Sequence, residues 1–310
     1  MKSAYQNCML CPRRCGVDRT SGKTGFCGQS AQMKIAYAGL HSGEEPVLIR
    51  GKGSGTIFFS GCTLQCCFCQ NYQLSRSGMG REITEEEFTG ILFSLQEQGA
   101  SNINLVSGTQ FIPSIINSIK GACKKGFRLP VVWNTSGFET PASLLQLNEI
   151  VDVYCSDVKT LSADTSASLF STPAYPEVVK NAVEQMIKKK PLEFKGESLV
   201  RGVILRHCVL PAHIGESCSV LKWLDSFGSN KFLVSLMFQY SPCGENLSES
   251  INRTVNEEEY SSVMSCLDEL PSIEGFVQDL TDSEAWLPDF SRKNPFETDL
   301  SKSVWHWLEK

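Results

Sequence analysis

Strand and helix patterns alternate along this 310-residue chain from about residue 56 to residue 242. Apolar residues at helical spacing follow each of the first five apolar runs that are typical of strands. Alternating units of this kind build right-handed βαβ connections and a parallel sheet. Six units are too few to close an eight-stranded barrel, so we expect an α/β fold with either an open, curved barrel or a doubly wound sheet. The six predicted strands lie in residues 55–61, 102–108, 129–137, 150–159, 199–211 and 232–242.

Each predicted strand ends in polar or reactive residues. The residues at these carboxyl ends, called the strand exits below, are SGC, VSGT, WNTSG, SDVK, LRH and FQYSP. Because the carboxyl ends of parallel strands meet at one edge of a sheet, functional groups gather there in both architectures. We therefore expect the site at these exits.

The chain is expected to divide into three regions. Residues 1–50 form a small Cys-rich N-terminal metal module with an extended lead-in, residues 51–280 form the α/β core, and residues 281–310 form a C-terminal extension. The extension contains Trp286, Trp305 and Trp307 and does not continue the alternating pattern. We interpret it as a tail packed on the outside.

Cysteine is the unusual feature of the composition: there are fourteen, and most fall in two clusters near the N-terminus. The chain has no signal-peptide core and no apolar run of about 18 residues, so we expect a cytoplasmic protein without a membrane partner. Clustered thiols in a reducing compartment hold metal or iron–sulfur centres more often than disulfides. The formal net charge of −5, without a long basic tract, argues against a nucleic-acid partner.

The segment CTLQCCFC, directly after the first predicted strand, contains a C-x3-C-x2-C motif formed by Cys62, Cys66 and Cys69. A cluster of four irons needs one thiolate for each iron, so three thiolates leave one iron open to a substrate. The alternatives are a zinc site that lacks its fourth ligand or buried core thiols, although zinc sites usually have paired C-x2-C units. Cys67 is adjacent to Cys66 and should point elsewhere.

This motif, in the first β-to-α loop, resembles the signature of the radical S-adenosylmethionine (SAM) superfamily. The wider run GSGTIFFSGCTLQCCFCQNYQLS resembles the branch related to pyruvate formate-lyase activating enzyme, in particular its activating-enzyme-like iron–sulfur paralogues. Further matching segments are NCMLCPRRCGV, HSGEEPVL, VVWNTSGF, IVDVYCSDVK, LRHCVLP and VSLMFQYSP, from residue 8 to about residue 243. Of the two architectures we predict the open partial (β/α)6 TIM-like barrel.

The resemblance implies roles for individual positions. Cys62, Cys66 and Cys69 would ligate a [4Fe–4S] cluster, and Phe68 would lie near the adenine of SAM. The other implied SAM contacts are Ser107, Gly108 and Thr109 near the methionine amino group, Asn134 and Thr135 in place of an Asp-Thr pair, Asp157 and Lys159 at the nucleoside and a nearby cation, and Arg206 with His207 near the methionine carboxylate or the substrate.

The implied activity is an oxidoreductase reaction. The reduced cluster cleaves SAM, and the 5′-deoxyadenosyl radical abstracts hydrogen from a protein, peptide or small molecule, with a flavodoxin- or ferredoxin-type electron donor. Glycyl-radical activation of a partner protein is the favoured case, although residues 106–110 lack the Gly-Gly-Glu of true activating enzymes and have Gln110 where the paralogues often have His. The alternatives from other classes are a non-catalytic iron–sulfur electron carrier or scaffold, and a zinc-stapled binding module.

Cys8, Cys11, Cys15 and Cys27 supply four thiolates within 20 residues. Four is the count for a closed zinc site or for a second complete [4Fe–4S] cluster, and the sequence does not distinguish these two. The alternative without metal is a disordered, reduced arm.

Residues outside these motifs are given structural interpretations. We expect Glu44 and Glu45 in a solvated loop, the alternative being that they face the active site. We expect His41 as an ordinary loop residue and Cys208 as a small buried residue.

Overall fold

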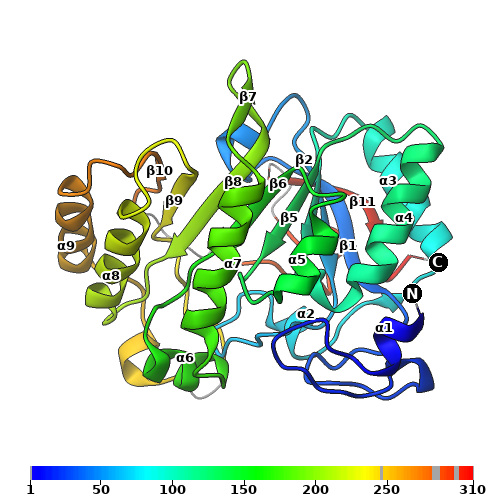
Figure 1. The fold of residues 1–310 in the computed structure, drawn as a ribbon, viewed down its shortest axis with the longest axis horizontal. Helices are drawn as coiled ribbons and strands as arrows, with labels where there is room; N and C mark the ends of the chain where they lie inside the picture. Colours follow the sequence, from blue (N-terminus) through cyan, green and yellow to red (C-terminus); the bar gives the residue numbers. More distant parts are fainter. Residues whose placement is uncertain (1, 245–246, 281–286, 297–299, 310) are drawn as a thin grey trace.

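One mixed sheet organises the chain, and the computed structural model describes residues 2–244, 247–280, 287–296 and 300–309. Neighbouring strands follow the order β10-β9-β8-β6-β5-β4-β2-β1-β11. These strands are β1 (Lys34–His41), β2 (Ser54–Phe59), β4 (Ile103–Val106), β5 (Val131–Thr135), β6 (Val153–Asp157), β8 (Ser198–Cys208), β9 (Leu233–Met237), β10 (Gly275–Val277) and β11 (Ser301–His306). Off this path, β3 (Arg81–Glu82) pairs with β1, and β7 (Glu193–Lys195) forms a projecting hairpin with β8 (Figure 1).

The six predicted strands are all present, as β2, β4, β5, β6, β8 and β9, and they are parallel. β10 adds a further parallel strand beside β9, whereas β1 and β11 are antiparallel at the other edge. Within the described part of the chain, the two terminal strands β10 and β11 do not pair with each other, so the sheet stays open. The predicted open partial barrel is confirmed.

Helices pack side by side along one face of the sheet (Figure 1). They are α3 (Glu85–Glu97), α4 (Ile112–Lys124), α5 (Pro141–Leu147), α7 (Tyr175–Lys189), α8 (Ile214–Asp225) and α9 (Glu257–Asp268), while α6 (Ala163–Phe170) lies beyond the lower end of α7 (Figure 1). A capping box starts α3: the Thr84 hydroxyl accepts from the Glu87 N–H, and the Glu87 carboxylate accepts from the Thr84 N–H. Among the described helices, none is both long and apolar enough to cross a membrane.

Alternation along the strands gives the sheet two different faces. On β5, Trp133 belongs to the main core under the helices, whereas the adjacent Val132 belongs, with Leu48, to a separate cluster on the opposite face. Leu48 lies in the connection between β1 and β2, which contains the short 3-10 helix η2 (Pro46–Leu48). This connection therefore covers the concave face near the amino ends of the strands and leaves their carboxyl ends open for a site.

The C-terminal segment is packed on the sheet. β11 pairs with β1, and the rings of Phe290 and Phe296 pack in a cluster with Tyr37. The indole N–H of Trp307 donates to the Phe290 carbonyl at 2.9 Å. The sequence predicted a packed tail here but did not predict a strand, and Trp286 lies outside the described residues.

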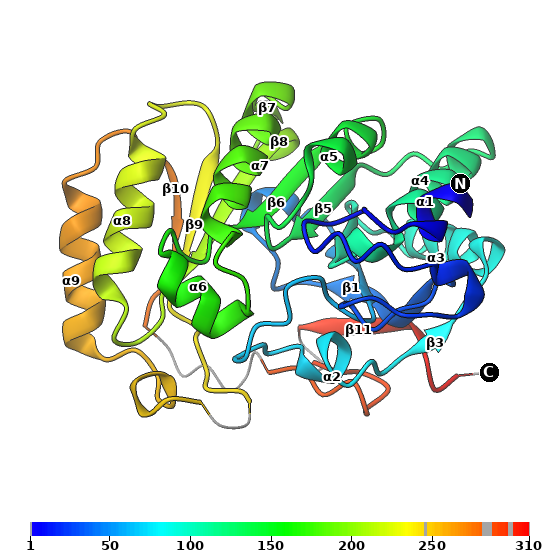
Figure 2. The same ribbon diagram turned by 60° about the horizontal axis from the view of Figure 1, so that its bottom comes forward.

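The N-terminal residues form a mostly irregular module at the edge where the parallel strands end (Figure 2). It contains α1 (Lys2–Gln6) and the turn η1 (Arg19–Ser21). Arg19 is only 1% exposed and donates to the carbonyl oxygens of Gln29, Ser30 and Gln110. The Ser143 hydroxyl donates to the Leu10 carbonyl at 2.6 Å. The module is thus docked on the core through main-chain carbonyl groups.

Candidate active site

The loop after β2 carries the three cysteines of the predicted motif. The Leu64 N–H donates to Cys62 Sγ at 3.4 Å. Burial raises the pKa of both Cys66 and Cys69, and the nearby Cys62 adds to the rise in each. The three sulfur atoms are therefore close enough to influence one another.

A cavity of about 260 Å³ opens beside this loop at the carboxyl ends of the strands. Phe68 lines it, and the rings of Phe170 and Tyr240 pack edge-on against Phe68 at centroid distances of 6.0 and 5.7 Å. The predicted site residues that line the cavity are Cys66, Phe68, Cys69, Asn134, Asp157, Lys159 and Arg206. The structure thus brings the cysteine loop and the exits of β5, β6 and β8 together around one space.

Asp157, at the end of β6, is the centre of an ionic network on the cavity wall. Its carboxylate accepts from Arg206 Nε at 2.9 Å and from Lys159 Nζ at 2.8 Å. Arg206 also donates to Asn134 Oδ1 at 2.7 Å. Burial favours the neutral acid, but the two cations hold the pKa of Asp157 at about 2. Burial likewise opposes the charge on Lys159, yet the Asp157 carboxylate raises the pKa of Lys159, so the network is fully ionised at neutral pH.

Thr109 and Thr135, both predicted SAM contacts, direct their hydroxyl groups to a buried carboxylate. Oε1 of Glu139 accepts from the Thr109 hydroxyl at 2.7 Å, the Thr135 hydroxyl at 2.8 Å and the Trp133 indole N–H at 3.1 Å. Burial raises the pKa of Glu139. The two threonine side chains do not line the cavity; they join the exits of β4 and β5 behind it.

The remaining predicted residues of the second exit, Ser107 and Gly108, form a turn tied to the cysteine loop by Gln110. The Gln110 amide donates to the carbonyl oxygens of Ser60, Gly61 and Ser107 at 2.9, 3.2 and 2.8 Å. Ser107 has a φ of +58°, a conformation that non-glycine residues rarely adopt. Gln110 therefore fixes the relative position of the first two strand exits.

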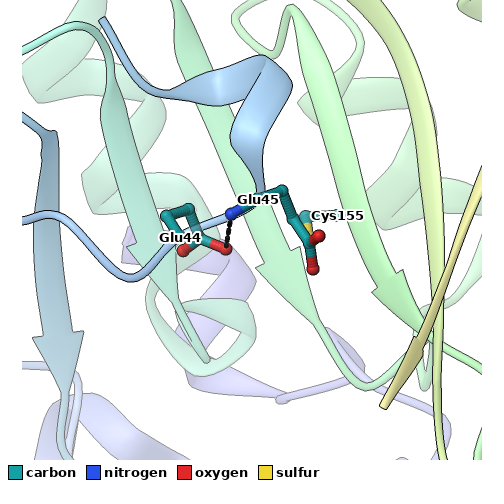
Figure 3. A group of neighbouring side chains, drawn as sticks. All are labelled: Glu44, Glu45 and Cys155. Atoms are coloured by element: carbon teal, nitrogen blue, oxygen red, sulfur yellow. Dashed lines mark hydrogen bonds between the residues drawn. The ribbon is translucent and has the colours of Figure 1, made fainter. Parts of the chain in front are cut away.

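Glu44 and Glu45 are not in a solvated loop, so that prediction is wrong. The Glu44 side chain is 8% exposed; it accepts from the Asn104 amide and from the Glu45 N–H, and it lies 3.8 Å from Arg206 Nη1. Figure 3 shows both carboxylates beside the Cys155 thiol, and ligand atoms of the three residues lie within 4.8 Å of one another. Burial raises the pKa of Glu45, whereas Arg206 opposes the rise. We interpret the pair as the second anionic partner of Arg206.

Sequence reasoning missed several other residues of the cavity wall. These are His41, Gly43, Thr56, Phe58, Gln70, Asn71, Val106, Cys208, Met237, Gln239, Tyr240, Pro288 and Phe296, whereas Glu44 realises the alternative stated for it above. Strand alternation contained a signal for Cys208, which lies on the same face of β8 as Arg206. No local signal existed for His41 and Phe296, whose rings lie 4.8 Å apart, because they come from opposite ends of the chain. His207, the neighbour of Arg206 on β8, faces away from the cavity. Its two ring nitrogens are hydrogen-bonded to the Val158 carbonyl oxygen and the Ser217 hydroxyl.

The four N-terminal cysteines gather in one place. Cys8, Cys11 and Cys27 are buried and Cys15 is half-buried. Burial raises the pKa of Cys11 to about 12, and the other three thiols add to the rise. The Phe26 N–H donates to Cys15 Sγ at 3.3 Å. The module thus presents four neighbouring free thiols.

Comparison with known proteins identifies the class. Residues 56–195 match the family model described as Radical SAM superfamily. The chain is 31% identical over 253 residues to Uncharacterized protein MJ0674 from Methanocaldococcus jannaschii, and the match covers 78% of this chain and 68% of that protein. The chain belongs to the radical SAM superfamily.

Similar solved structures include Streptococcus suis SuiB bound to S-adenosylmethionine, with 13% identity and a TM-score of 0.47. The match covers 70% of this chain and 48% of SuiB, so this chain spans about half of that protein. A domain of pyruvate-formate lyase-activating enzyme from Bacteroides vulgatus matches with 10% identity and a TM-score of 0.38, covering 54% of this chain and 91% of the domain. The family assignment rests on the sequence matches.

Superfamily membership implies a [4Fe–4S] cluster and SAM as cofactors, and the residues present fit both. The loop offers three free thiols, and two of them open onto the cavity. Three thiolates suit a cluster that keeps one iron open. Beside them, the network of Asp157, Lys159 and Arg206 supplies charges of both signs, which suits a ligand with amino, carboxylate and hydroxyl groups.

Proposed function

We propose that this protein cleaves SAM reductively and uses the 5′-deoxyadenosyl radical to abstract hydrogen from a substrate. Bound at Cys62, Cys66 and Cys69, the cluster would supply the electron for that cleavage. The observation that carries the proposal is that Cys66 and Cys69 line the same cavity as the ionic network around Asp157.

The side chains of the chain have distinct parts in this proposal. Arg206 and Lys159 attract the carboxylate of the methionine part, and Asn134 and Asp157 accept from hydroxyl or ammonium groups. Phe68, held between Phe170 and Tyr240, offers a flat apolar surface to the adenine.

For the substrate we propose a peptide or protein, with glycyl-radical activation of a partner enzyme as the specific case. This part rests on the resemblance of the cysteine-loop segment to the activating-enzyme branch. A flavodoxin- or ferredoxin-type protein would supply the electrons.

The test is anaerobic reconstitution with iron and sulfide, followed by reduction, addition of SAM and measurement of 5′-deoxyadenosine. The Cys62→Ala/Cys66→Ala/Cys69→Ala variant is the negative control. Cys123→Ala is the matched control, because Cys123 is an exposed free cysteine on α4. We expect product from the wild type and from Cys123→Ala but none from the triple variant. Absence of product from loaded, reduced wild type would overturn the proposal in favour of an electron carrier or scaffold.

A further inference from the structure

We infer that Cys8, Cys11, Cys15 and Cys27 hold a second [4Fe–4S] cluster, which passes electrons to the cluster at the 62–69 loop. The first half of this inference stands by itself, and the relay rests on the proposed function. Four thiolates complete the coordination of a cubane, so this cluster would have no open iron and would serve electron transfer only.

The N-terminal thiols are not gathered as closely as ligands of a single zinc ion would be. Four thiolates around one zinc ion, each about 2.3 Å from the metal, lie about 3.8 Å apart. Among the described residues, Glu44, Glu45 and Cys155 form the one set of three ligand atoms that lie within 4.8 Å of one another, so no three of the N-terminal thiols are that close. A cubane holds its thiolates at four separate irons and therefore further apart than a single ion does. The cysteines of the 62–69 loop share this wider spacing.

The module touches the catalytic loop next to its first cysteine. A Cβ on Gly61 would lie 2.5 Å from the Cys27 carbonyl oxygen, and Gly61 precedes Cys62 directly. The Gln65 amide, inside the loop, donates to the Phe26 carbonyl at 2.9 Å. Cys27, a ligand residue of the N-terminal site, is therefore in van der Waals contact with Gly61, the residue before Cys62 of the catalytic loop.

Arg13 lies between the two sets of thiols. Its guanidinium donates to the carbonyl oxygens of Thr63 and Leu64 in the catalytic loop at 3.1 and 3.3 Å, and to those of Phe170 and Ser171 at 2.7 and 2.8 Å. It is close enough to interact electrostatically with Cys11 and Cys15 on one side and with Cys62 and Cys66 on the other. A fixed cation between two anionic clusters lowers their mutual repulsion and keeps the catalytic loop in place.

The relay step is a one-electron transfer in which no bond changes. The reduced N-terminal cluster is oxidised by one electron, and the oxidised catalytic cluster is reduced by one. A low-potential one-electron donor, such as a reduced flavoprotein or iron–sulfur protein, then restores the N-terminal cluster. Cys15, the half-buried ligand, marks the side on which such a donor would approach. Cys66 at the catalytic loop is buried, so an outer relay shortens the path from solvent.

Metal analysis tests the site without any activity measurement. Anaerobically reconstituted wild type should contain about eight irons per chain and no stoichiometric zinc. Variants that lose either cysteine set, Cys8→Ala/Cys11→Ala/Cys27→Ala or Cys62→Ala/Cys66→Ala/Cys69→Ala, should each keep about four irons and one reduced-cluster EPR signal. About four irons with one zinc in the wild type, the zinc being lost with the N-terminal cysteines, would overturn the inference.

A single-turnover count tests the relay. Protein is reduced, freed of reductant by gel filtration and mixed with excess SAM. Wild type should form about two molecules of 5′-deoxyadenosine per chain, one for each cluster electron, whereas the N-terminal variant should form about one. One molecule from wild type, with the second EPR signal remaining, would overturn the relay.

Two further measurements separate failure of the second cluster from unfolding of a variant and from failure of the proposed function. Cys15→Ser removes only the least buried ligand and replaces the triple variant if the triple variant does not fold. Its melting temperature shows whether Cys15→Ser itself is folded. It should also form about one molecule of 5′-deoxyadenosine per chain, while Cys123→Ser should match the wild type. If wild type forms no 5′-deoxyadenosine, the proposed function fails, whereas iron content and EPR still decide whether the second cluster exists.

Discussion

The carbonyl oxygen of Cys27 occupies the space that a side chain on Gly61 would need: a Cβ there would approach it to 2.5 Å. Gly61 also has a φ of +76°, in the left-handed region that favours glycine. The N-terminal module and the cysteine loop thus fit together only because this residue has no side chain.

Gly61→Ala should therefore destabilise the protein more than its backbone conformation alone explains. Gly78→Ala is the matched control, because Gly78 has a similar φ of +64° but a Cβ there would approach nothing closer than Gln29 Nε2, at 3.9 Å. We expect the free energy of unfolding to fall by about 3 kcal/mol for Gly61→Ala and by about 1 kcal/mol for the control. Urea denaturation of the metal-free, reduced protein measures both. Equal losses would show that the contact with Cys27 contributes nothing.

Asp157→Asn should disrupt the cavity wall, because it leaves Arg206 and Lys159 without their shared anion. Breaking a largely buried ion pair from one side costs about 3 kcal/mol. We expect a loss of that size in urea denaturation, together with at least about tenfold weaker SAM binding to the reconstituted protein. Asp268→Asn, exposed at the end of α9, is the control and should change neither quantity. Unchanged stability in Asp157→Asn would contradict the role of the network.

The same carboxylate should make stability depend on acid pH. Arg206 and Lys159, against the effect of burial, lower the pKa of Asp157 from 3.8 to about 2. Its contribution is therefore fully present above about pH 4 and is lost as the pH falls toward 2. Wild type should lose more stability between pH 4 and pH 2 than Asp157→Asn does. Parallel pH profiles of the two proteins would refute this assignment.

Adjacent cysteines of the loop should behave differently. Cys66 lines the cavity with Cys69, whereas the Cys67 thiol is close to Arg76. Cys66→Ser should therefore remove about four irons per chain after reconstitution, and Cys67→Ser should keep the wild-type iron content. Loss of iron in both variants would mean that the loop binds its cluster with a different set of thiols.

The parallel core was predictable because its information is local. Apolar runs such as 129–137 identify strands by themselves, and Thr84 with Glu87 marks a helix start. Since parallel strands end at one edge, Asp157 and Arg206 could be predicted to share a site although 49 residues separate them. The family resemblance then supplied the cofactors.

The features that the sequence did not predict depend on long-range packing. β11 forms a strand only because β1 has a free edge, and Glu44 is buried because its loop covers the concave face. An acidic pair beside glycine and proline has the composition of a solvated loop, so its burial could not be predicted locally. Glu139 also carries no motif, and its importance appears only where three donors meet.

The stability of the protein should depend on Glu139 as a hydrogen-bond acceptor and not on its negative charge. Its Oε1 accepts from Thr109, Thr135 and Trp133, and burial raises the pKa of the carboxyl. Glu139→Ala would leave three buried donors without a partner, so we expect the free energy of unfolding to fall by about 4 kcal/mol. Glu139→Gln keeps an oxygen acceptor and removes a buried charge, so its loss should be about 1 kcal/mol or less. Urea denaturation at neutral pH, with near-ultraviolet circular dichroism for the Trp133 environment, distinguishes the two variants. An equal, large loss in both would mean that the charge itself holds the exits of β4 and β5 together.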